Sequence, residues 1–248
     1  MFNPKTERIG KIAELHKKTI EQIESLFVGR TNLYIDYANV RPWADKLEWH
    51  IDLKRLKQFL DSFDNIKSVN FYHGTLRGDT ESEEMADSIK KLGFSLKTKD
   101  VKIMRQFIDY TSIKPNSPAL LGKFIRKCLL LKYDLETVEY LNRKFKELND
   151  KGQMYIEDRK CNFDVEIGRD MLLDFERSNA DTFVLWSGDS DFSDPIYQLL
   201  KDKKKVVLFA TAGKVSKELS KLSEEGLFIF DIQKIKDFIC WKKEISSL

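Results

Sequence analysis

The chain has 248 residues, of which 42% are hydrophobic and 33% charged, so it is long enough to bury a sizeable core. No signal peptide or membrane span is expected, because the N-terminal stretch lacks an apolar segment and no run approaches ~20 apolar residues. The net charge of +3 permits a polyanionic partner without requiring one. Three widely spaced cysteines argue against a disulfide framework or a zinc ribbon and fit a reducing, cytoplasmic location.

The N-terminal segment has a helical pattern. Residues 5–27 carry apolar side chains at helical spacing, with lysines and glutamates between them. We therefore expect one N-terminal amphipathic helix within residues 1–29. Its apolar stripe fits a helix that packs on its own domain, or one that dimerises or docks the chain.

Strand-like and helix-like segments alternate through most of the remaining chain. The predicted strands are residues 32–37, 68–74, 94–101, 181–186, 205–210 and 227–232. The predicted helices are residues 51–63, 82–93, 162–175, 194–203 and 215–222, followed by a C-terminal helix. This alternation predicts an α/β domain at residues 30–241, with a mostly parallel central sheet and helices on both faces.

One stretch, at about residues 113–152, departs from this alternation, because its pattern is helical where a short connection would suffice. We interpret it as a helical insertion of one or two helices. Its cations, Arg126 and Lys127 among them, alternate with aromatic residues, which is compatible with an arm that faces nucleic acid. Acidic residues are interspersed as well, so an ordinary amphipathic helix pair explains the pattern equally well. A homodimer through this insertion or through the N-terminal helix is compatible with either interpretation.

Polar and acidic side chains gather where two of the predicted strands end. Asp36 and Asn39 follow the first strand in YIDYAN, and Ser187, Asp189 and Asp191 follow a later strand in VLWSGDSDF. Ligands of doubly wound sheets bind outside the carboxyl ends of the strands, where the strand order reverses. If these two strands are neighbours at that point, their carboxylates converge.

A group of carboxylates indicates a cation, because like charges raise each other's pKa. Hard oxygen ligands select Mg²⁺ or Mn²⁺, and two such ions could activate a water and stabilise the leaving oxygen in phosphodiester cleavage. Asp164, at the start of a predicted helix, could supply a further charge, with Asp170 behind it. A single aspartate in such a position is more commonly a turn or cap residue. That interpretation is strongest for Asp164, Asp170 and Asp194, and we expect Asp194 to cap a helix.

Three other motifs compete for the same segment. A hydrolase with Ser190 as nucleophile needs a downstream histidine, but all three histidines lie far upstream. An EF-hand loop that begins at Asp189 would need glycine at position 194 and glutamate at position 200, which hold Asp194 and Leu200. The DxD spacing of Asp189 and Asp191 fits a dehalogenase-type phosphatase, although little more than fifty residues remain for the rest of that site. Only this last alternative stays open.

The segments YIDYANV, KCNFDVEIGRDML and VLWSGDSDF, with KKVVLFA after them, resemble in that order the NYN domain, the LabA-like (DUF88) branch of the PIN-like nucleases. The resemblance covers roughly residues 30–100 and 155–235. It implies a Rossmann-like PIN fold, divalent metal ions and endonucleolytic cleavage of RNA. A module on the same fold that binds RNA or a protein partner without cutting is the alternative.

The resemblance also implies a set of site residues. The acidic metal site would comprise Asp36, Asp164, Asp189 and Asp191. Asn39 and Ser187 would be polar members of the same catalytic site, and Asp170 matches a commonly acidic helix position in support. Many relatives have a lysine three residues before the helix aspartate, where this chain has Cys161 with Lys160 beside it. We expect Lys160, together with Arg126 and Lys127, to contact RNA.

Overall fold

The computed structural model describes residues 1–43, 50–211 and 213–241, and the chain divides into two compact units. Met1–Asp100 and Cys161–Leu248 form one, here called the sheet unit, and Val101–Lys160 forms the other, here called the inserted unit. The inserted unit contains the stretch at 113–152 that the sequence singles out. The predicted domain boundaries themselves stay predictions.

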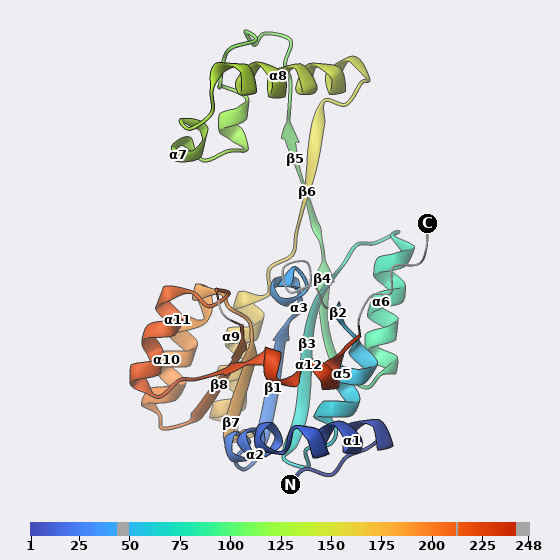
Figure 1. Ribbon diagram of the computed structural model, residues 1–248, viewed down its shortest axis with the longest axis vertical. Coiled ribbons are helices and arrows are strands. Elements are labelled where there is room, and N and C mark those ends of the chain that lie inside the picture. The colour runs from blue at the N-terminus through green and yellow to red at the C-terminus, as the bar shows by residue number, and fades with distance from the viewer. Residues whose placement is uncertain (44–49, 212, 242–248) are drawn as a thin grey trace. The chain divides into compact units, whose positions relative to one another are not determined.

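Six parallel strands form the centre of the sheet unit (Figure 1). They are β1 (Thr31–Asp36), β3 (Ile66–Thr75), β4 (Ser95–Asp100), β7 (Thr182–Trp186), β8 (Lys205–Ala210) and β9 (Phe228–Asp231). Their order across the sheet is β4–β3–β1–β7–β8–β9, so the direction of winding reverses between β1 and β7. The predicted α/β fold with a parallel central sheet is confirmed, and the strands that carry the two acidic loops are neighbours.

Helices cover both faces of this sheet. Figure 1 shows α5 and α6 on one side, and α9, α10 and α11 on the other. Their bounds are α5 (Leu53–Leu60), α6 (Thr80–Lys91), α9 (Asp164–Glu176), α10 (Ser193–Lys201) and α11 (Lys217–Lys221). A short helix, α3 (Tyr37–Val40), follows β1 directly. This covering explains why every residue of β1 and β7 is buried, since strands buried on both faces read as continuous apolar runs.

Short elements complete the sheet unit. They are β2 (His50–Ile51), η2 (Ser190–Phe192), η3 (Leu222–Glu225), η4 (Ile232–Ile235), α12 (Lys236–Ile239) and β10 (Cys240–Trp241). β2 and β10 pair antiparallel, and α12 contacts α5. The C-terminal segment therefore packs back on the first crossover helix.

The N-terminal segment forms two helices, α1 (Glu7–Leu15) and α2 (Lys17–Leu26), so the expectation of one helix is wrong. The break falls at His16, whose ring packs edge-on against Phe238 at 5.7 Å and whose Nε2 lies 3.0 Å from Asp237. These contacts come from the far end of the chain, so local periodicity does not reveal them. Most of the apolar stripe is buried in the core of the sheet unit, while Leu15 at the end of α1 is 83% exposed. Its buried members are Ile9, Ile20, Ile23 and Leu26.

The inserted unit combines a two-stranded antiparallel ribbon with short helices. Its elements are β5 (Lys102–Phe107), η1 (Leu121–Lys123), α7 (Lys127–Leu130), α8 (Leu135–Asp150) and β6 (Tyr155–Lys160). The sequence predicted neither ribbon strand, because most of their side chains are exposed and no apolar alternation marks them. A small core holds the unit together, consisting of Ile108, Tyr110, Leu120, Leu121 and Val138 with the buried amide of Asn142.

Asn142 fixes the loop before η1. Its Nδ2 donates hydrogen bonds to the carbonyl oxygens of Pro115 at 2.7 Å and Ser117 at 2.8 Å. A buried amide thus replaces regular secondary structure in holding that loop. None of the helices in residues 1–43, 50–211 and 213–241 is long and apolar enough to cross a bilayer.

Candidate active site

Asp36 and Ser187 meet where the strand order reverses, at the carboxyl ends of β1 and β7. The parallel register pairs Ile35 with Trp186, which sets the following residues side by side. Ser187 Oγ donates a hydrogen bond of 3.2 Å to Asp36 Oδ2, and both side chains are buried. The structure thus brings together two of the site residues that the sequence predicted from separate segments.

Asn39 ties the same two loops together from α3. Its backbone N–H donates to Asp36 Oδ1 at 3.3 Å, and its side-chain Oδ1 accepts from the Gly188 N–H at 3.2 Å. Gly188 lies so close to Lys214 that a Cβ at this position would overlap the Lys214 carbonyl oxygen. Glycine is therefore required here, and the Asn39 hydrogen bond holds its backbone in place.

Asp189 and Asp191 follow on the η2 turn. The Asp189 N–H donates to Ser187 Oγ at 3.3 Å, and Asp189 Oδ1 accepts from the Asp191 N–H at 3.2 Å as the cap of η2. Asp194 lies within the first turn of α10, whose N-cap is Phe192 without a side-chain hydrogen bond. The expectation that Asp194 caps this helix is wrong, because η2 runs directly into α10 and has Asp189 as its own cap.

Asp164 is the first residue of α9 and shares a cleft of about 740 Å³ with Asp191 and Asp194. Burial raises the pKa of the Asp164 carboxyl, and the carboxylates of Asp189 and Asp191 raise it further. Asp164 is half-buried, whereas Asp191 is exposed at the rim. The third acidic segment that the sequence predicted therefore adjoins the other two.

Within this group, the carboxyl of Asp36 has the pKa that is shifted most from its ordinary value. Burial raises its pKa to about 6, and the carboxylates of Asp164 and Asp189 add to the increase. The hydrogen bonds from Asn39 and Ser187 act in the opposite direction, because they stabilise the charged form. The protein thus holds a buried carboxylate among other carboxylates at a cost in free energy, which is a common property of functional sites.

Two carboxylates farther along α9 anchor that helix to the sheet. Tyr72 on β3 donates a hydrogen bond of 2.9 Å to Asp170 Oδ2. Asp174 Oδ2 accepts from Tyr34 Oη at 2.6 Å and from Asn32 Nδ2 at 2.9 Å, both on β1. Asp170, the predicted supporting residue, therefore contacts β3. The sequence analysis missed Asp174. The only sequence feature that pointed to it was its position four residues after Asp170, which places both carboxylates on the same face of the helix.

Lys99 is a cation that the sequence analysis also missed. It lies near the end of β4 and lines the same cleft as Asp164 and Asp191. Its Nζ lies 2.7 Å from Glu166 Oε1 and 4.7 Å from the centre of the Phe163 ring. Because Lys99 sits on the edge strand and reaches α9 only through the fold, its sequence neighbours give no signal for it.

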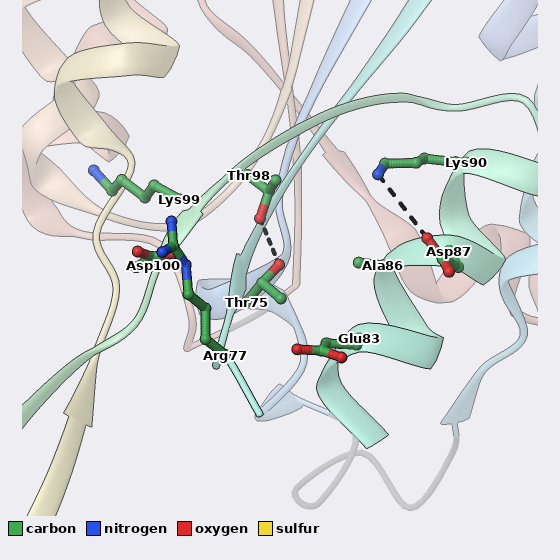
Figure 2. Close-up of a pocket in the computed structure, with 9 residues that line it drawn as sticks. All are labelled: Thr75, Arg77, Glu83, Ala86, Asp87, Lys90, Thr98, Lys99 and Asp100. Carbon is green, nitrogen blue, oxygen red and sulfur yellow. Dashed lines mark hydrogen bonds and ion pairs between the residues drawn. The ribbon is translucent and has the colours of Figure 1, made fainter. Parts of the chain in front are cut away.

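A second hollow of about 670 Å³ lies at the carboxyl ends of β3 and β4, beside α6 (Figure 2). It is lined by Thr75, Arg77, Glu83, Ala86, Asp87, Lys90, Thr98, Lys99 and Asp100. It has three cations and three carboxylates, of which Arg77 pairs with Asp100 at 3.0 Å and Lys90 with Asp87 at 4.0 Å. The hollow therefore has no unbalanced charge, and the acidic cleft is the stronger candidate for the active site.

The three predicted RNA contacts all belong to the inserted unit. Lys160 ends β6, with its Nζ 3.4 Å from Asp158 Oδ2. Arg126 precedes α7 and Lys127 is its first residue. All three side chains are exposed. Lys99 is thus the cation that the structure places beside the acidic cluster within the sheet unit.

The donor chemistry of the cluster fits a hard divalent cation, because its members offer carboxylate oxygens that repel one another. In the part of the chain that the structure describes, however, no three His, Cys, Asp or Glu side chains are arranged as a ready-made metal cage. The residues therefore fit such an ion by their chemistry and charge, and a closed set of ligands is not preformed.

Comparison with known proteins agrees with these features. A model of the NYN domain matches residues 123–230, a range that holds Asp164, Ser187, Asp189 and Asp191, while Asp36 and Asn39 lie outside it. Low amplitude and bright protein LabA of Synechococcus elongatus is 23% identical over 211 residues, 85% of this chain and 87% of LabA. Residues 123–230 are therefore similar to the NYN domain, and the chain is distantly similar to LabA over most of its length. NYN domains belong to the PIN-like nuclease superfamily, which associates this domain with nuclease and RNA-related functions.

A solved structure shares the fold of this chain. It is the crystal structure of a protein of unknown function from Vibrio parahaemolyticus RIMD 2210633, with a TM-score of 0.50 and 15% sequence identity. The match covers 85% of this chain and 96% of that one. At this identity the likeness concerns the fold alone, and it supports the mixed α/β architecture with a parallel central sheet.

Proposed function

We propose that this protein is a metal-dependent endoribonuclease whose active site is the acidic cluster at the carboxyl ends of β1 and β7. The observation that carries the proposal is the buried hydrogen bond between Asp36 and Ser187, with Asp164 and Asp189 close enough to raise the pKa of Asp36. The NYN family supports RNA as the substrate class and favours a nuclease over the dehalogenase-type phosphatase.

Asp36, Asp164, Asp189 and Asp191 would hold Mg²⁺ or Mn²⁺. When bound there, such an ion supplies positive charge against the scissile phosphate and acidifies a water molecule. In the hydrolysis a water oxygen attacks phosphorus while the bond from phosphorus to the leaving ester oxygen breaks. Asn39 and Ser187 are positioning residues in this proposal, because their hydrogen bonds join the loop after β1 to the loop after β7.

Lys99 would contact the RNA phosphate from within the acidic cleft. It is the cation that lines this cleft together with Asp164 and Asp191, and Glu166 holds its ammonium group at 2.7 Å. Lys99→Gln should therefore weaken cleavage chiefly through KM. Lys97→Gln, an exposed position two residues earlier on β4, is the matched control and should leave cleavage unchanged.

The test is cleavage of end-labelled single-stranded and hairpin RNA by purified protein with Mn²⁺. Asp36→Asn and Asp189→Asn should each reduce the cleavage rate by roughly 10²–10⁴-fold, a range typical for the loss of a catalytic group. Asp64→Asn, an exposed carboxylate outside the cluster, should cut as the unaltered protein does. Equal cleavage by all four proteins, or none of any RNA, would overturn the catalytic proposal.

Metal binding can be measured independently of activity. Titration of Mn²⁺ followed by its electron paramagnetic resonance should show bound ion for the unaltered protein and for Asp64→Asn. Asp36→Asn and Asp189→Asn should bind it markedly more weakly, because each loses a carboxylate charge. If Mn²⁺ binds but no RNA is cut, the fold is better described as a non-catalytic binding module.

A further inference from the structure

The inserted unit carries the positive charge of the chain. Residues 101–160 contain thirteen Lys and Arg against eight Asp and Glu, a net charge of +5, whereas the remaining residues sum to −2. All thirteen of these cationic side chains are exposed. Because the proposed active site is acidic and lies on the negatively charged unit, that unit by itself gives a polyanion little long-range attraction.

One part of this surface consists of six exposed residues within positions 126–133, around α7. This group, here called the α7 patch, consists of Arg126, Lys127, Leu129, Leu131, Lys132 and Tyr133. In the described part of the chain, no ion pair neutralises its three cations. Its aromatic member, Tyr133, has 41% of its surface exposed. Three cations, two exposed leucines and one aromatic ring therefore lie within eight residues.

The solvent-facing side of α8 continues the same chemistry. Tyr140 is 51% exposed, and Arg143 and Lys144 follow it at helical spacing, so the three side chains share one face. Lys144 Nζ lies 5.6 Å from the centre of the Tyr140 ring. The opposite face of α8 is the one that packs inward, through Val138 and Asn142.

The acidic residues of the unit cancel only part of this charge pattern, as where Glu147 pairs with Lys144 at 2.9 Å. Asp134 caps α8 by accepting from the Thr137 N–H at 2.7 Å, and Asp109 accepts from Thr111. These carboxylates are occupied with local backbone structure. Asp134, one of the interspersed acids that made an ordinary helix pair equally plausible in the sequence, therefore has a structural role of its own.

We propose that the inserted unit binds single-stranded RNA through the α7 patch and the solvent face of α8. Lys and Arg would pair with phosphates, and Tyr133 and Tyr140 would stack on unpaired bases, the combination by which proteins hold single strands without base-specific hydrogen bonds. The identity of the polyanion as RNA rests on the proposed function. A membrane surface fits less well, because α7 has only four residues and cannot present a long apolar face to a bilayer.

The test measures RNA binding by the full chain, using fluorescence anisotropy of a labelled, unstructured oligoribonucleotide in EDTA over a series of salt concentrations. The charge variant is Arg126→Gln, Lys127→Gln and Lys132→Gln together. The matched control is Lys5→Gln, Lys17→Gln and Lys18→Gln together, three exposed cations of the sheet unit. The aromatic variant is Tyr133→Ala with Tyr140→Ala.

For the charge variant, the slope of log affinity against log salt should become shallower by about 2, since each phosphate contact on a single strand contributes roughly 0.7. The aromatic variant should bind roughly tenfold or more weakly, with little change in that slope. The control variant should bind as the unaltered chain does. Because all altered side chains are exposed, thermal unfolding followed by circular dichroism should be unchanged for every variant.

The proposal would be overturned if the charge variant and its control lost RNA affinity equally. It would also be overturned if none of the variants altered RNA binding. If binding to phosphatidylserine vesicles depends on the α7 patch while RNA binding does not, the surface is a lipid site and the proposal fails. Loss of RNA binding in the charge variant, with no cleavage by any protein, supports this site while the proposed enzymatic function fails. If the charge variant binds and cleaves RNA as the unaltered chain does, the proposed RNA site fails while the proposed enzymatic function holds.

Discussion

The two units of this chain differ in what their residues are used for. The sheet unit buries its central strands and fixes its carboxylates with buried hydrogen bonds, such as the one between Asp36 and Ser187. The inserted unit has a small core and exposes most of its charge. Among the residues that the structure describes, nine of the sixteen exposed large hydrophobic residues lie in its sixty residues, out of proportion to its length.

This difference indicates that the sheet unit positions carboxylates, whereas the inserted unit presents cations that attract a polyanion. Acidic groups can be held near one another against their repulsion only by a rigid, deep core, which the six-stranded sheet provides. Cations that bind a flexible polymer need exposure and little rigidity, which a small helical unit provides. A single compact domain would have to combine both demands on one surface.

The largest expected effect follows from removing core volume. Phe209→Ala should destabilise the sheet unit by about 3–5 kcal/mol, because this fully buried ring packs against Phe27, Trp186 and Phe230. Leu120→Ala should instead reduce protection in residues 101–160 alone. Urea unfolding combined with hydrogen exchange separates the two responses, and equal loss of protection across both units would contradict the comparison.

A smaller effect concerns the dependence of folding stability on pH, which has opposite signs in the two units. Folding raises the pKa of Asp36 to about 6 through burial, so without divalent ions the sheet unit loses stability as pH rises from about 4 to 6. Asp36→Asn removes this penalty and should stabilise the protein at pH 7 by up to about 3 kcal/mol. Hydrogen bonding to Thr137 lowers the pKa of Asp134, so Asp134 stabilises its helix above its ordinary pKa and loses that effect in acid.

Chemical denaturation between pH 4 and 8 in EDTA measures both dependences. The gain from Asp36→Asn should grow up to about pH 6 and then level off. Mn²⁺ should stabilise the unaltered protein at pH 7 and leave Asp36→Asn nearly unaffected. A gain that is the same at every pH would show that burial of the Asp36 charge is not its cause.

Buried hydrogen bonds should give effects of roughly 1–3 kcal/mol, confined to the unit that contains them. Asp174→Ala leaves Tyr34 and Asn32 without their shared acceptor and should loosen α9, with a loss of RNA cleavage through Asp164. Asn142→Ala frees the loop held at Pro115 and Ser117 and should leave catalysis at saturating RNA unchanged. Hydrogen exchange and kcat measurements on both variants check this contrast.

The smallest effect concerns thiol chemistry. Cys128, within α7, is exposed, whereas Cys240 is buried and its pKa is raised to about 12. Iodoacetate should therefore alkylate Cys128 first in the native protein, as peptide mass mapping would show, without altering thermal stability. The added carboxylate lies in the middle of the α7 patch and should weaken RNA binding several-fold. Rapid alkylation of Cys240 would contradict the packing described for the sheet unit.

Sequence patterns predicted most of the sheet unit, because strands covered on both faces are continuous apolar runs. The loops after β1 and β7, which carry the acidic residues, were recognisable for a related reason. Their polar residues, Asp36 and Asp189 among them, interrupt such runs abruptly. Features that depend on distant contacts could not be predicted in this way. The break at His16 depends on Phe238, and the position of Lys99 beside the acids depends on α9.

The inserted unit was harder to predict for a physical reason. Its ribbon strands have exposed side chains on both faces, so neither apolar periodicity nor burial distinguishes them from a loop. Its helices were visible, because α8 buries Val138 and Asn142 on one face. Cap residues also remained ambiguous, since both Asp189 and Asp194 precede apolar helical residues and only the structure shows which one caps a turn.

The pairing of β1 with β7 also bears on the timing of protein synthesis. These neighbouring strands are separated by the whole inserted unit, so their contact closes a very long loop and is expected to form late in folding. A ribosome that has not yet released Asp189 holds a chain in which Asp36 lacks the carboxylate that follows β7. The nascent chain thus exposes its cationic unit before its acidic cluster can exist, which would keep any cleavage activity dormant until synthesis is well advanced.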